Sequence, residues 1–317
     1  MRRVLITGIS GFAGSHLAER LVNKAEVWGT CLDNNLENIS GVPGLKLVQC
    51  DLLDPAMIEA ALEQARPDTI FHLAGQSVPS LSFGAPAETL RTNIFSTLNL
   101  FEAALIRAPE AVILNIGSGD EYGEVSPEEL PVKEGTELRP MNPYAVSKVT
   151  QDLLAFQYNR SRNLKVVRCR PFNHYGPRQA ASLVASAFAK QVAEIEAGIK
   201  TEKVLKVGSL DASKDFLYVK DVAAAYELLA RKGEPGEVYN ICSGSPVKIQ
   251  TILDTLLSLT NERIEVATDP ARLRSKEAPV LYGDAGKLKG LGWAPGYTLD
   301  RGLKELLDFW REKVKKG

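Results

Sequence analysis

Three glycines between an apolar run and a helical pattern constrain the fold of this 317-residue chain more than any other feature. Residues 4–7 are typical of a buried strand, and Gly8, Gly11 and Gly14 follow at once, before Leu17 and Leu21 recur at helical spacing. Glycine permits a tight turn and lets the backbone approach a pyrophosphate, which the free amides and positive dipole of a helix N-terminus bind. The segment therefore predicts strand, nucleotide-binding turn and helix, with a second strand at residues 26–31.

Apolar runs then alternate with helical patterns along the first half of the chain. Strands are predicted at residues 46–49, 69–73, 111–116 and 165–169, and helices begin at Pro55, Pro86 and Pro143. Such alternation predicts an α/β fold: a Rossmann-type doubly wound parallel sheet with its cofactor across the carboxyl ends of the strands. After Arg170 the elements shorten between Pro and Gly residues. We therefore divide the chain into a nucleotide-binding domain, 1–170, and a smaller substrate lobe, 171–317.

A tyrosine and a lysine stand one helical turn apart in the helix that begins at Pro143. Tyr144 and Lys148 share one face of that helix, and Ser118 lies upstream at the end of a predicted strand. A phenol titrates near pH ~10, so a nearby ammonium is expected to lower the pKa of Tyr144. The three side chains could then move a proton while a hydride moves, with Ser118 holding the substrate oxygen.

Composition excludes several classes of function. Net charge is -1 and the pI is near 6.4, so the chain lacks the basic stripes of nucleic-acid-binding proteins. Four cysteines and three histidines are scattered without metal or redox spacing, which predicts reduced thiols and no metal site. The first apolar run ends at Thr7 and Gly8, too early for a signal peptide, and no stretch could span a bilayer. We expect a cytoplasmic protein that has no membrane or nucleic-acid partner.

The glycine pattern, the trio of Ser118, Tyr144 and Lys148, and the Asp51-Leu52 pair after the third strand resemble the extended short-chain dehydrogenase/reductase family over essentially the whole chain. Residues 139–144, 170–178, 207–216 and 272–277 resemble the branch acting on GDP-linked 6-deoxyhexoses, which contains GDP-mannose 4,6-dehydratases and GDP-4-keto-6-deoxymannose reductases. The resemblance implies an interleaved topology in which segments near 215–242 return to the large domain. It also implies a homodimer formed by helices near residues 87–104 and 144–158.

The cofactor implied by the resemblance is NAD or NADP. The residues expected to contact it are Gly8, Gly11, Phe12, Ala13, Gly14, Asp33, Asp51, Leu52, Leu73, Ala74, Gly75, Tyr144, Lys148 and Pro171. At the end of the second strand a carboxylate suits a ribose hydroxyl, whereas an arginine suits the additional phosphate of NADP. The chain has Leu32 where relatives often have arginine, and Asp33 follows it, which favours NAD.

The substrate implied by the resemblance is a nucleotide sugar, with GDP-hexose preferred. Its expected contacts are Ser82, Asn173, Arg178, Lys214, Arg274 and Glu277, with Ser80 as a further candidate for the hexose. A guanidinium can bind two diphosphate oxygens and a carboxylate can accept ribose hydroxyls. Lys214 replaces the arginine usual in this branch, so it keeps the charge but loses the planar fork.

The reaction depends on a possible additional carboxylate. A 4,6-dehydratase needs one for elimination, whereas a 4-ketoreductase needs only hydride, a proton and a site for the ketone. Aligned on Tyr122 and Gly123, Asp120 stands where GDP-mannose dehydratases have glutamate. This shortened acid and the shorter chain favour a GDP-4-keto-6-deoxymannose reductase. GDP-mannose 4,6-dehydratase is the alternative, followed by a UDP-sugar 4-epimerase and a non-catalytic NAD-binding module.

Overall fold

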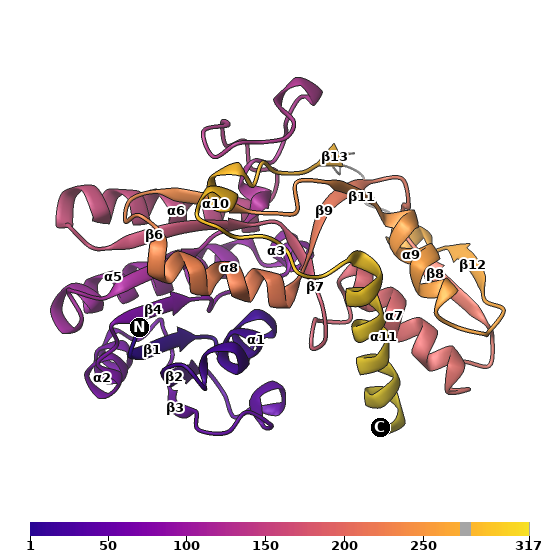
Figure 1. The fold of residues 1–317 in the computed structure, drawn as a ribbon, viewed down its shortest axis with the longest axis horizontal. Coiled ribbons are helices and arrows are strands. Elements are labelled where there is room, and N and C mark those ends of the chain that lie inside the picture. Colours follow the sequence, from indigo (N-terminus) through magenta and orange to yellow (C-terminus); the bar gives the residue numbers. More distant parts are fainter. Residues whose placement is uncertain (273–279, 317) are drawn as a thin grey trace.

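A parallel β-sheet forms the larger layer of the chain (Figure 1), in a computed structural model that describes residues 1–272 and 280–316. Within these residues the seven strands run in the order β10-β6-β5-β4-β1-β2-β3, and every neighbouring pair is parallel. The strands are β1 (Arg3–Thr7), β2 (Glu26–Cys31), β3 (Lys46–Gln49), β4 (Thr69–His72), β5 (Val112–Ile116), β6 (Val166–Pro171) and β10 (Val238–Ile241). Because β1 lies between β2 and β4, strand order reverses there, where such sheets bind ligands.

Helices cover both faces of this sheet. Alternate residues of β1 point to opposite sides: Val4 and Ile6 join one buried cluster and Leu5 the other. The first cluster is covered by α1 (Phe12–Leu21), α8 (Val219–Lys232) and α10 (Gly286–Gly290). The second is covered by α2 (Pro55–Ala65), α5 (Ser96–Arg107) and α6 (Pro143–Arg162). The near-continuous apolar runs of the strands follow from this burial on both sides.

Local capping chemistry fixes where two of these helices begin. The Asp54 carboxylate accepts the Ala56 amide at 2.9 Å before α2, and the Asn142 side chain accepts the Ala145 amide at 2.8 Å before α6. Proline occupies the first helical position in both, where its missing N–H costs nothing. The start of α6 matters for function, because it places Tyr144 in the first turn and Lys148 in the second.

The smaller lobe packs around strand β9 (Ser213–Tyr218), to the right of the sheet in Figure 1. Strand β9 pairs with β7 (Asn173–Tyr175), β11 (Pro246–Lys248) and β13 (Val280–Leu281), while β8 (Val204–Val207) pairs with β12 (Glu265–Thr268). Helices α7 (Val184–Glu196), α9 (Ile249–Ser258) and α11 (Leu299–Lys316) share its apolar core. None of the helices in the described residues is both long and apolar enough to cross a membrane.

The structure confirms the predicted fold class, and it also contains short elements between the predicted helices and strands. Strand β10 is an edge of the large sheet and α8 covers it, so residues 219–241 lie in the large layer. Before α5, the chain forms α3 (Pro79–Gly84), α4 (Pro86–Leu90) and a π-helical turn (Arg91–Phe95). The remaining short turns are η1 (Glu37–Ile39), η3 (Gly119–Glu121), η4 (Pro127–Glu129) and η5 (Pro270–Arg272).

A buried carboxylate in β9 connects the strands of the smaller lobe. Asp215 is fully buried and accepts the backbone amides of Ser243 at 2.7 Å, Gly244 at 2.9 Å and Gly283 at 3.4 Å. Burial raises the pKa of this carboxyl, whereas the amide hydrogen bonds act in the opposite direction. This one side chain therefore connects β9 with the segment at residues 243–244 and with the segment at residue 283.

Replacing Asp215 by asparagine is expected to reduce the free energy of unfolding by about 2 kcal/mol, because an amide nitrogen would face a backbone N–H that it cannot accept. Urea unfolding of the two proteins measures the difference. Asp254→Asn is the matched control, because Asp254 lies exposed on α9. Equal stability of D215N and D254N would contradict this role of Asp215.

Candidate active site

The glycine turn lies at the carboxyl end of β1, against the start of α1. Gly8 has φ +67°, and the Gly11 amide donates to its carbonyl at 3.0 Å. A Cβ on Gly14 would lie 2.4 Å from the same carbonyl oxygen. The turn is therefore closed by backbone contacts that leave no space for side chains at Gly8 or Gly14, and it presents the amino end of a ten-residue helix.

The residues after β4 lie beside this turn, as the pairing of β1 with β4 requires. The Ala74 amide donates to the Thr7 hydroxyl at 3.2 Å, and a Cβ on Gly8 would lie 3.0 Å from the Ala74 Cα. Gly75 has φ +152°, and a Cβ there would lie 2.7 Å from the Asn93 side-chain oxygen. Two strand ends thus form one narrow backbone cradle that fits the diphosphate of a dinucleotide.

Asn93 completes this cradle from the π-helical turn and was not anticipated. Its oxygen accepts the Gln76 amide at 2.7 Å, while its nitrogen donates to the Gln76 carbonyl at 3.1 Å and to the Ser147 hydroxyl at 2.8 Å. The side chain is fully buried and fixes the chain after Gly75 against α6. The feature of the sequence that could have indicated Asn93 is its amide side chain within an apolar helical pattern.

The other candidate cofactor residues surround the same strand ends. Asp51 accepts the Leu53 amide at 2.8 Å, and the carbonyl of buried Leu52 accepts the Asn99 side chain at 3.1 Å. Asp33 is exposed and accepts the Asn35 amide at 3.0 Å. Leu73 follows β4, Phe12 and Ala13 open α1, and Pro171 ends β6. These positions fit a bound dinucleotide, and the individual contacts stay predictions.

Ser118, Tyr144 and Lys148 meet at the carboxyl end of β5. Ser118 precedes η3 and hydrogen-bonds the Tyr144 phenol through its side chain. The Lys148 ammonium donates to the Ile116 carbonyl at 2.9 Å and lies 5.9 Å from the centre of the Tyr144 ring. Tyr144 and Lys148 are both buried. The predicted trio is therefore assembled in one site.

The electrostatics of the trio differ from the sequence expectation in sign. Burial, followed by the charge of Asp120, raises the pKa of Tyr144, while the hydrogen bond to Ser118 acts against this rise. Burial also lowers the pKa of Lys148 to about 8. The expected net lowering of the Tyr144 pKa does not appear in the chain by itself, because burial and the charge of Asp120 dominate. The stabilisation of a phenolate by Lys148 during turnover stays a prediction. At neutral pH, Tyr144 is a neutral phenol.

The candidate substrate residues occupy several environments. Asn173 is exposed on β7, and Lys214 lies on β9 opposite Val247 and Leu281. Buried Ser82 donates to the Pro79 carbonyl at 2.7 Å, within its own short helix, and Ser80 is exposed. Arg274 and Glu277 lie outside the described residues. The substrate contacts of all six remain predictions.

Arg178 connects the smaller lobe to the nucleotide-binding layer. Its guanidinium pairs with Glu19 at 2.8 Å and donates to the Asn38 carbonyl at 2.8 Å and to the His16 Nδ1 atom at 2.7 Å. Burial lowers the pKa of His16, which keeps its Nδ1 available as an acceptor. In this structure Arg178 therefore bonds the first helix and the segment after β2.

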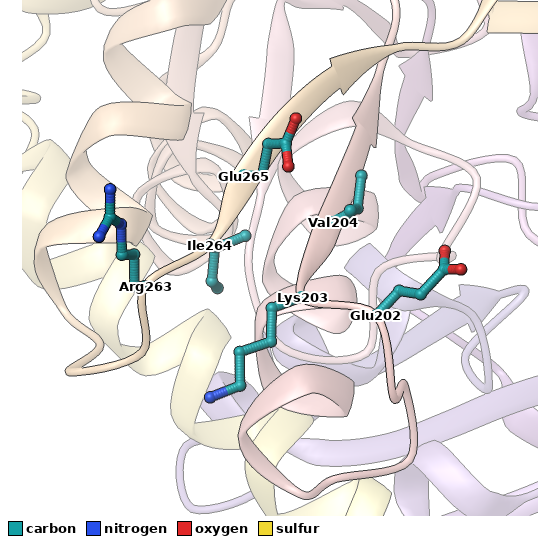
Figure 2. Close-up of a pocket in the computed structure, with 6 residues that line it drawn as sticks. All are labelled: Glu202, Lys203, Val204, Arg263, Ile264 and Glu265. Carbon is teal, nitrogen blue, oxygen red and sulfur yellow. The ribbon is translucent and has the colours of Figure 1, made fainter.

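A separate pocket of about 660 Å³ lies in the smaller lobe, beside β8 and β12. Figure 2 shows its six lining residues, which are Glu202, Lys203, Val204, Arg263, Ile264 and Glu265. Its charges are mixed, and none of the candidate catalytic residues lines it. Across residues 1–272 and 280–316, no cluster of three or more His, Cys, Asp or Glu residues could hold a metal ion.

Comparison with known proteins assigns the chain to a family. The sequence profile described as GDP-mannose 4,6 dehydratase matches residues 5–306. The chain belongs to the GDP-mannose 4,6 dehydratase family. It is also 37% identical over 315 residues to the GDP-6-deoxy-D-mannose reductase of Pseudomonas aeruginosa, an alignment covering 99% of each protein. The predicted membership of this extended short-chain dehydrogenase/reductase branch is confirmed.

Solved structures agree with this family assignment. RMD from Pseudomonas aeruginosa in complex with NADPH superimposes with a TM-score of 0.84 at 34% identity, covering 99% of this chain and 100% of that one. The Thermus thermophilus UDP-glucose 4-epimerase in complex with NAD gives 0.87 at 29% identity, covering 98% and 99%. Solved structures of this architecture thus include complexes with NADPH and with NAD.

The glycine turn provides a direct test of the cofactor site. A Cβ on Gly11 would meet only the Gly8 carbonyl, at 3.1 Å, so Gly11→Ala should fold while its methyl group obstructs the pyrophosphate position. We expect binding of NADH or NADPH, followed by nicotinamide fluorescence, to weaken about tenfold or more. Gly41→Ala is the control, because nothing lies within 4 Å of its added Cβ. Unchanged affinity in G11A would reject this turn as the pyrophosphate site.

Proposed function

We propose that the protein is an NAD(P)-dependent nucleotide-sugar oxidoreductase that reduces the 4-keto group of a GDP-4-keto-6-deoxyhexose. The observation that carries this proposal is the 37% identity, over almost the whole of both chains, to a GDP-6-deoxy-D-mannose reductase. The assembled trio of Ser118, Tyr144 and Lys148 supplies the chemistry that such a reduction needs.

The protonation state of Tyr144 supports the reductive direction. Reduction of a ketone requires a proton donor, whereas oxidation of an alcohol requires a base. Burial keeps Tyr144 protonated, and Asp120 disfavours its phenolate further. The chain by itself therefore holds the group in the form that reduction uses.

The residues then have distinct roles. Ser118 and Tyr144 donate hydrogen bonds to the C4 carbonyl oxygen, which polarises the ketone. A reduced nicotinamide, when bound, supplies the hydride that forms the new C4–H bond. As the carbonyl π electrons move to oxygen, Tyr144 gives that oxygen its phenolic proton. The Lys148 ammonium stabilises the phenolate that remains, until a proton from solvent restores the phenol.

For the cofactor we favour NADH over NADPH. Residues 25–45 comprise β2 and the segment after it. They contain no lysine or arginine that could bind a 2′-phosphate. Asp33 is exposed at the end of β2, and Arg178, which approaches Asn38, is paired with Glu19. The Pseudomonas relative was solved in complex with NADPH, so a preference for NADH would distinguish this chain from that relative.

GDP-mannose 4,6-dehydratase is the second candidate, and Asp120 is the observation that favours it. Asp120 stands two residues after Ser118, in the η3 turn, so its carboxylate is a candidate for the elimination base. A dehydratase would first need Tyr144 as a base and then a carboxylate for the elimination.

The deciding experiment mixes the purified protein with GDP-4-keto-6-deoxymannose and NADH or NADPH, and follows the absorbance of the reduced nicotinamide. We expect rapid oxidation, with a higher kcat/KM for NADH. Tyr144→Phe should lower kcat about 10²- to 10⁴-fold and leave cofactor binding unchanged, because the phenyl ring keeps the packing but has no proton to donate.

Other outcomes would assign other functions. Conversion of GDP-mannose to a 4-keto-6-deoxy product in the presence of NAD would identify a dehydratase, and interconversion of UDP-glucose and UDP-galactose an epimerase. Cofactor binding with no turnover of any of these sugars would indicate a non-catalytic NAD-binding module. A strong preference for NADPH would reject the NADH assignment while leaving the ketone reduction intact.

We also propose that the protein is a homodimer formed through α6 and the helices before it. Val146, Leu153 and Phe156 on α6 are exposed apolar side chains, as is Phe95 in the π-helical turn that packs on α6. Leu153 is 57% exposed and lies two turns from Val146 on the same face. Such a surface is typical of a helical interface between two copies.

Leu153→Glu should convert the dimer to a monomer, because it would place two carboxylates in an apolar interface. Sedimentation velocity measures the change. Ile199→Glu is the matched control, since Ile199 is 62% exposed but lies beyond α7 in the smaller lobe. A monomeric wild-type protein, or dissociation caused equally by I199E, would reject the α6 interface.

A further inference from the structure

A buried histidine ends strand β4, two residues before the Ala74 amide of the glycine cradle. His72 is 1% exposed, and its Nδ1 atom lies 2.9 Å from the hydroxyl oxygen of Thr7, its partner on β1. Its Nε2 atom lies 2.9 Å from the hydroxyl oxygen of Thr97 on α5. Both threonines are fully buried. The ring is therefore removed from water and hydrogen-bonded on both sides, and the proposed proton transfer uses neither bond.

The direction of each hydrogen bond follows from the backbone groups at the two ends of this chain of contacts. The Ala74 amide can only donate, and it donates to Thr7 Oγ1 at 3.2 Å. The Asn93 carbonyl can only accept, and it accepts the Thr97 hydroxyl at 3.0 Å. Because Thr97 has then used its one proton, its oxygen accepts the proton on Nε2 of His72.

His72 is therefore the neutral tautomer that carries its proton on Nε2. Burial, followed by the charge of Lys148, lowers the pKa of His72 to about 3, so the ring holds a single proton at neutral pH. With that proton on Nε2, the Nδ1 atom is an acceptor, and Thr7 donates its hydroxyl proton to it. Every N–H and O–H from Ala74 to Asn93 then points in the same direction along the chain of contacts.

The two ends of this chain of contacts hold the residues on either side of Gly75. One end is the Ala74 amide. At the other end, the side-chain oxygen of Asn93 accepts the Gln76 amide at 2.7 Å, and its side-chain nitrogen donates to Ser147 on α6 at 2.8 Å. A Cβ on Gly75 would lie 2.7 Å from that same oxygen. The narrow part of the cradle is therefore joined to α5 and α6 through buried polar side chains.

We propose that His72 is a positioning residue for the cofactor: as the tautomer protonated on Nε2 it joins Thr7 to Thr97, and it thereby fixes the cradle around Gly75 for the diphosphate of a nicotinamide dinucleotide. The inference rests on the proposed function, because that reaction uses a dinucleotide bound in this cradle. His72 acts through its two threonine partners and takes no part in the proton transfer.

The tautomer can be measured in the wild-type protein. The chain contains three histidines, so ¹⁵N labelling of histidine gives three pairs of ring signals. The pair that persists in both His16→Gln and His174→Gln belongs to His72. We expect a protonated Nε2 and an unprotonated Nδ1, unchanged between about pH 6 and about pH 8. A proton on Nδ1, or an imidazolium in this pH range, would overturn the proposal.

Two replacements of a hydroxyl by a methyl group test the connection to the cofactor. Thr7→Val removes the acceptor of the Ala74 amide, and Thr97→Val removes the acceptor on the other side of the His72 ring. Each variant leaves a buried donor without a partner, so binding of NADH and NADPH, measured by nicotinamide fluorescence, should weaken about tenfold. The double variant should bind no more weakly than the weaker single variant, because both changes break one chain of contacts.

Thr69→Val is the matched control. Thr69 is 2% exposed and lies at the other end of β4, where its hydroxyl donates to Asp68 at 2.9 Å. T69V should lose stability and keep the wild-type affinity for the cofactor. Unchanged affinity in T97V, equal weakening by all three single variants, or additive losses in the double variant would each overturn the role of His72. A wild-type protein that binds the cofactor but is inactive on the 4-keto sugar would reject the proposed function, and these measurements would still decide the role of His72.

Discussion

The arrangement of the site depends on one buried ammonium, which lies at the carboxyl ends of the strands. Lys148 donates to the Ile116 carbonyl, at the carboxyl end of β5, so the helix α6 is joined to the strand that leads into Ser118. This contact places the charge below the phenol and away from solvent. Burial lowers the pKa of the Lys148 ammonium and raises the pKa of the Tyr144 phenol, because the packing of α6 on the sheet removes water from both groups. The proton donor of the proposed reaction therefore follows from how α6 packs on the sheet.

Burying an ammonium next to a neutral phenol requires compensation nearby. A charge removed from water loses hydration that a single carbonyl restores only in part. In the neighbouring turn Glu121 Oε2 lies 2.9 Å from Arg170 Nε, and Arg170 Nη2 lies 2.6 Å from Asp152 Oδ2, so cations and carboxyl groups are buried together beside Lys148. Arg168 adds a second cation at 2.6 Å from Asp152, so the acidic and basic groups alternate through the network. Replacing Arg170 would remove one of the two cations beside Asp152 and the guanidinium beside Glu121, so the network depends most on this residue.

Sequence reasoning found the local features of this architecture. The strands at 26–31 and 46–49 were predicted with the bounds of β2 and β3, because both segments contain short runs of residues with strand propensity between turn residues. The starts of α2, α4 and α6 were predicted from Pro55, Pro86 and Pro143, since proline suits a first helical position. The trio was found because two members lie on one helix and the third ends a strand. Spacing within an element was sufficient for each of these predictions.

Features that depend on contacts between distant segments were not predictable in this way. Asn93 bonds Ser147, 54 positions away, and Arg170 meets Glu121 and Asp152 from another strand. No periodicity in the sequence says which buried polar group pairs with which. The sign of the pKa shift at Tyr144 was missed for a related reason, because spacing shows that Lys148 is near but not how much water the fold removes. Burial is a property of the whole packed sheet.

The turn between Ser118 and Tyr122 also shows how one fold can support different reactions. Asp120 and Glu121 are adjacent in the η3 turn. The charges of both disfavour the Tyr144 phenolate, and Glu121 Oε2 also lies 2.9 Å from Arg170 Nε. A carboxylate near the phenol opposes its ionisation, which suits proton donation to a ketone. Elimination would ask the same carboxylate to reach the substrate as a base while Tyr144 accepts a proton beside it. Because Asp120 is one methylene shorter than the glutamate of the dehydratases it resembles, its carboxylate reaches less far toward a substrate, whereas proton donation by Tyr144 to a ketone needs no such reach.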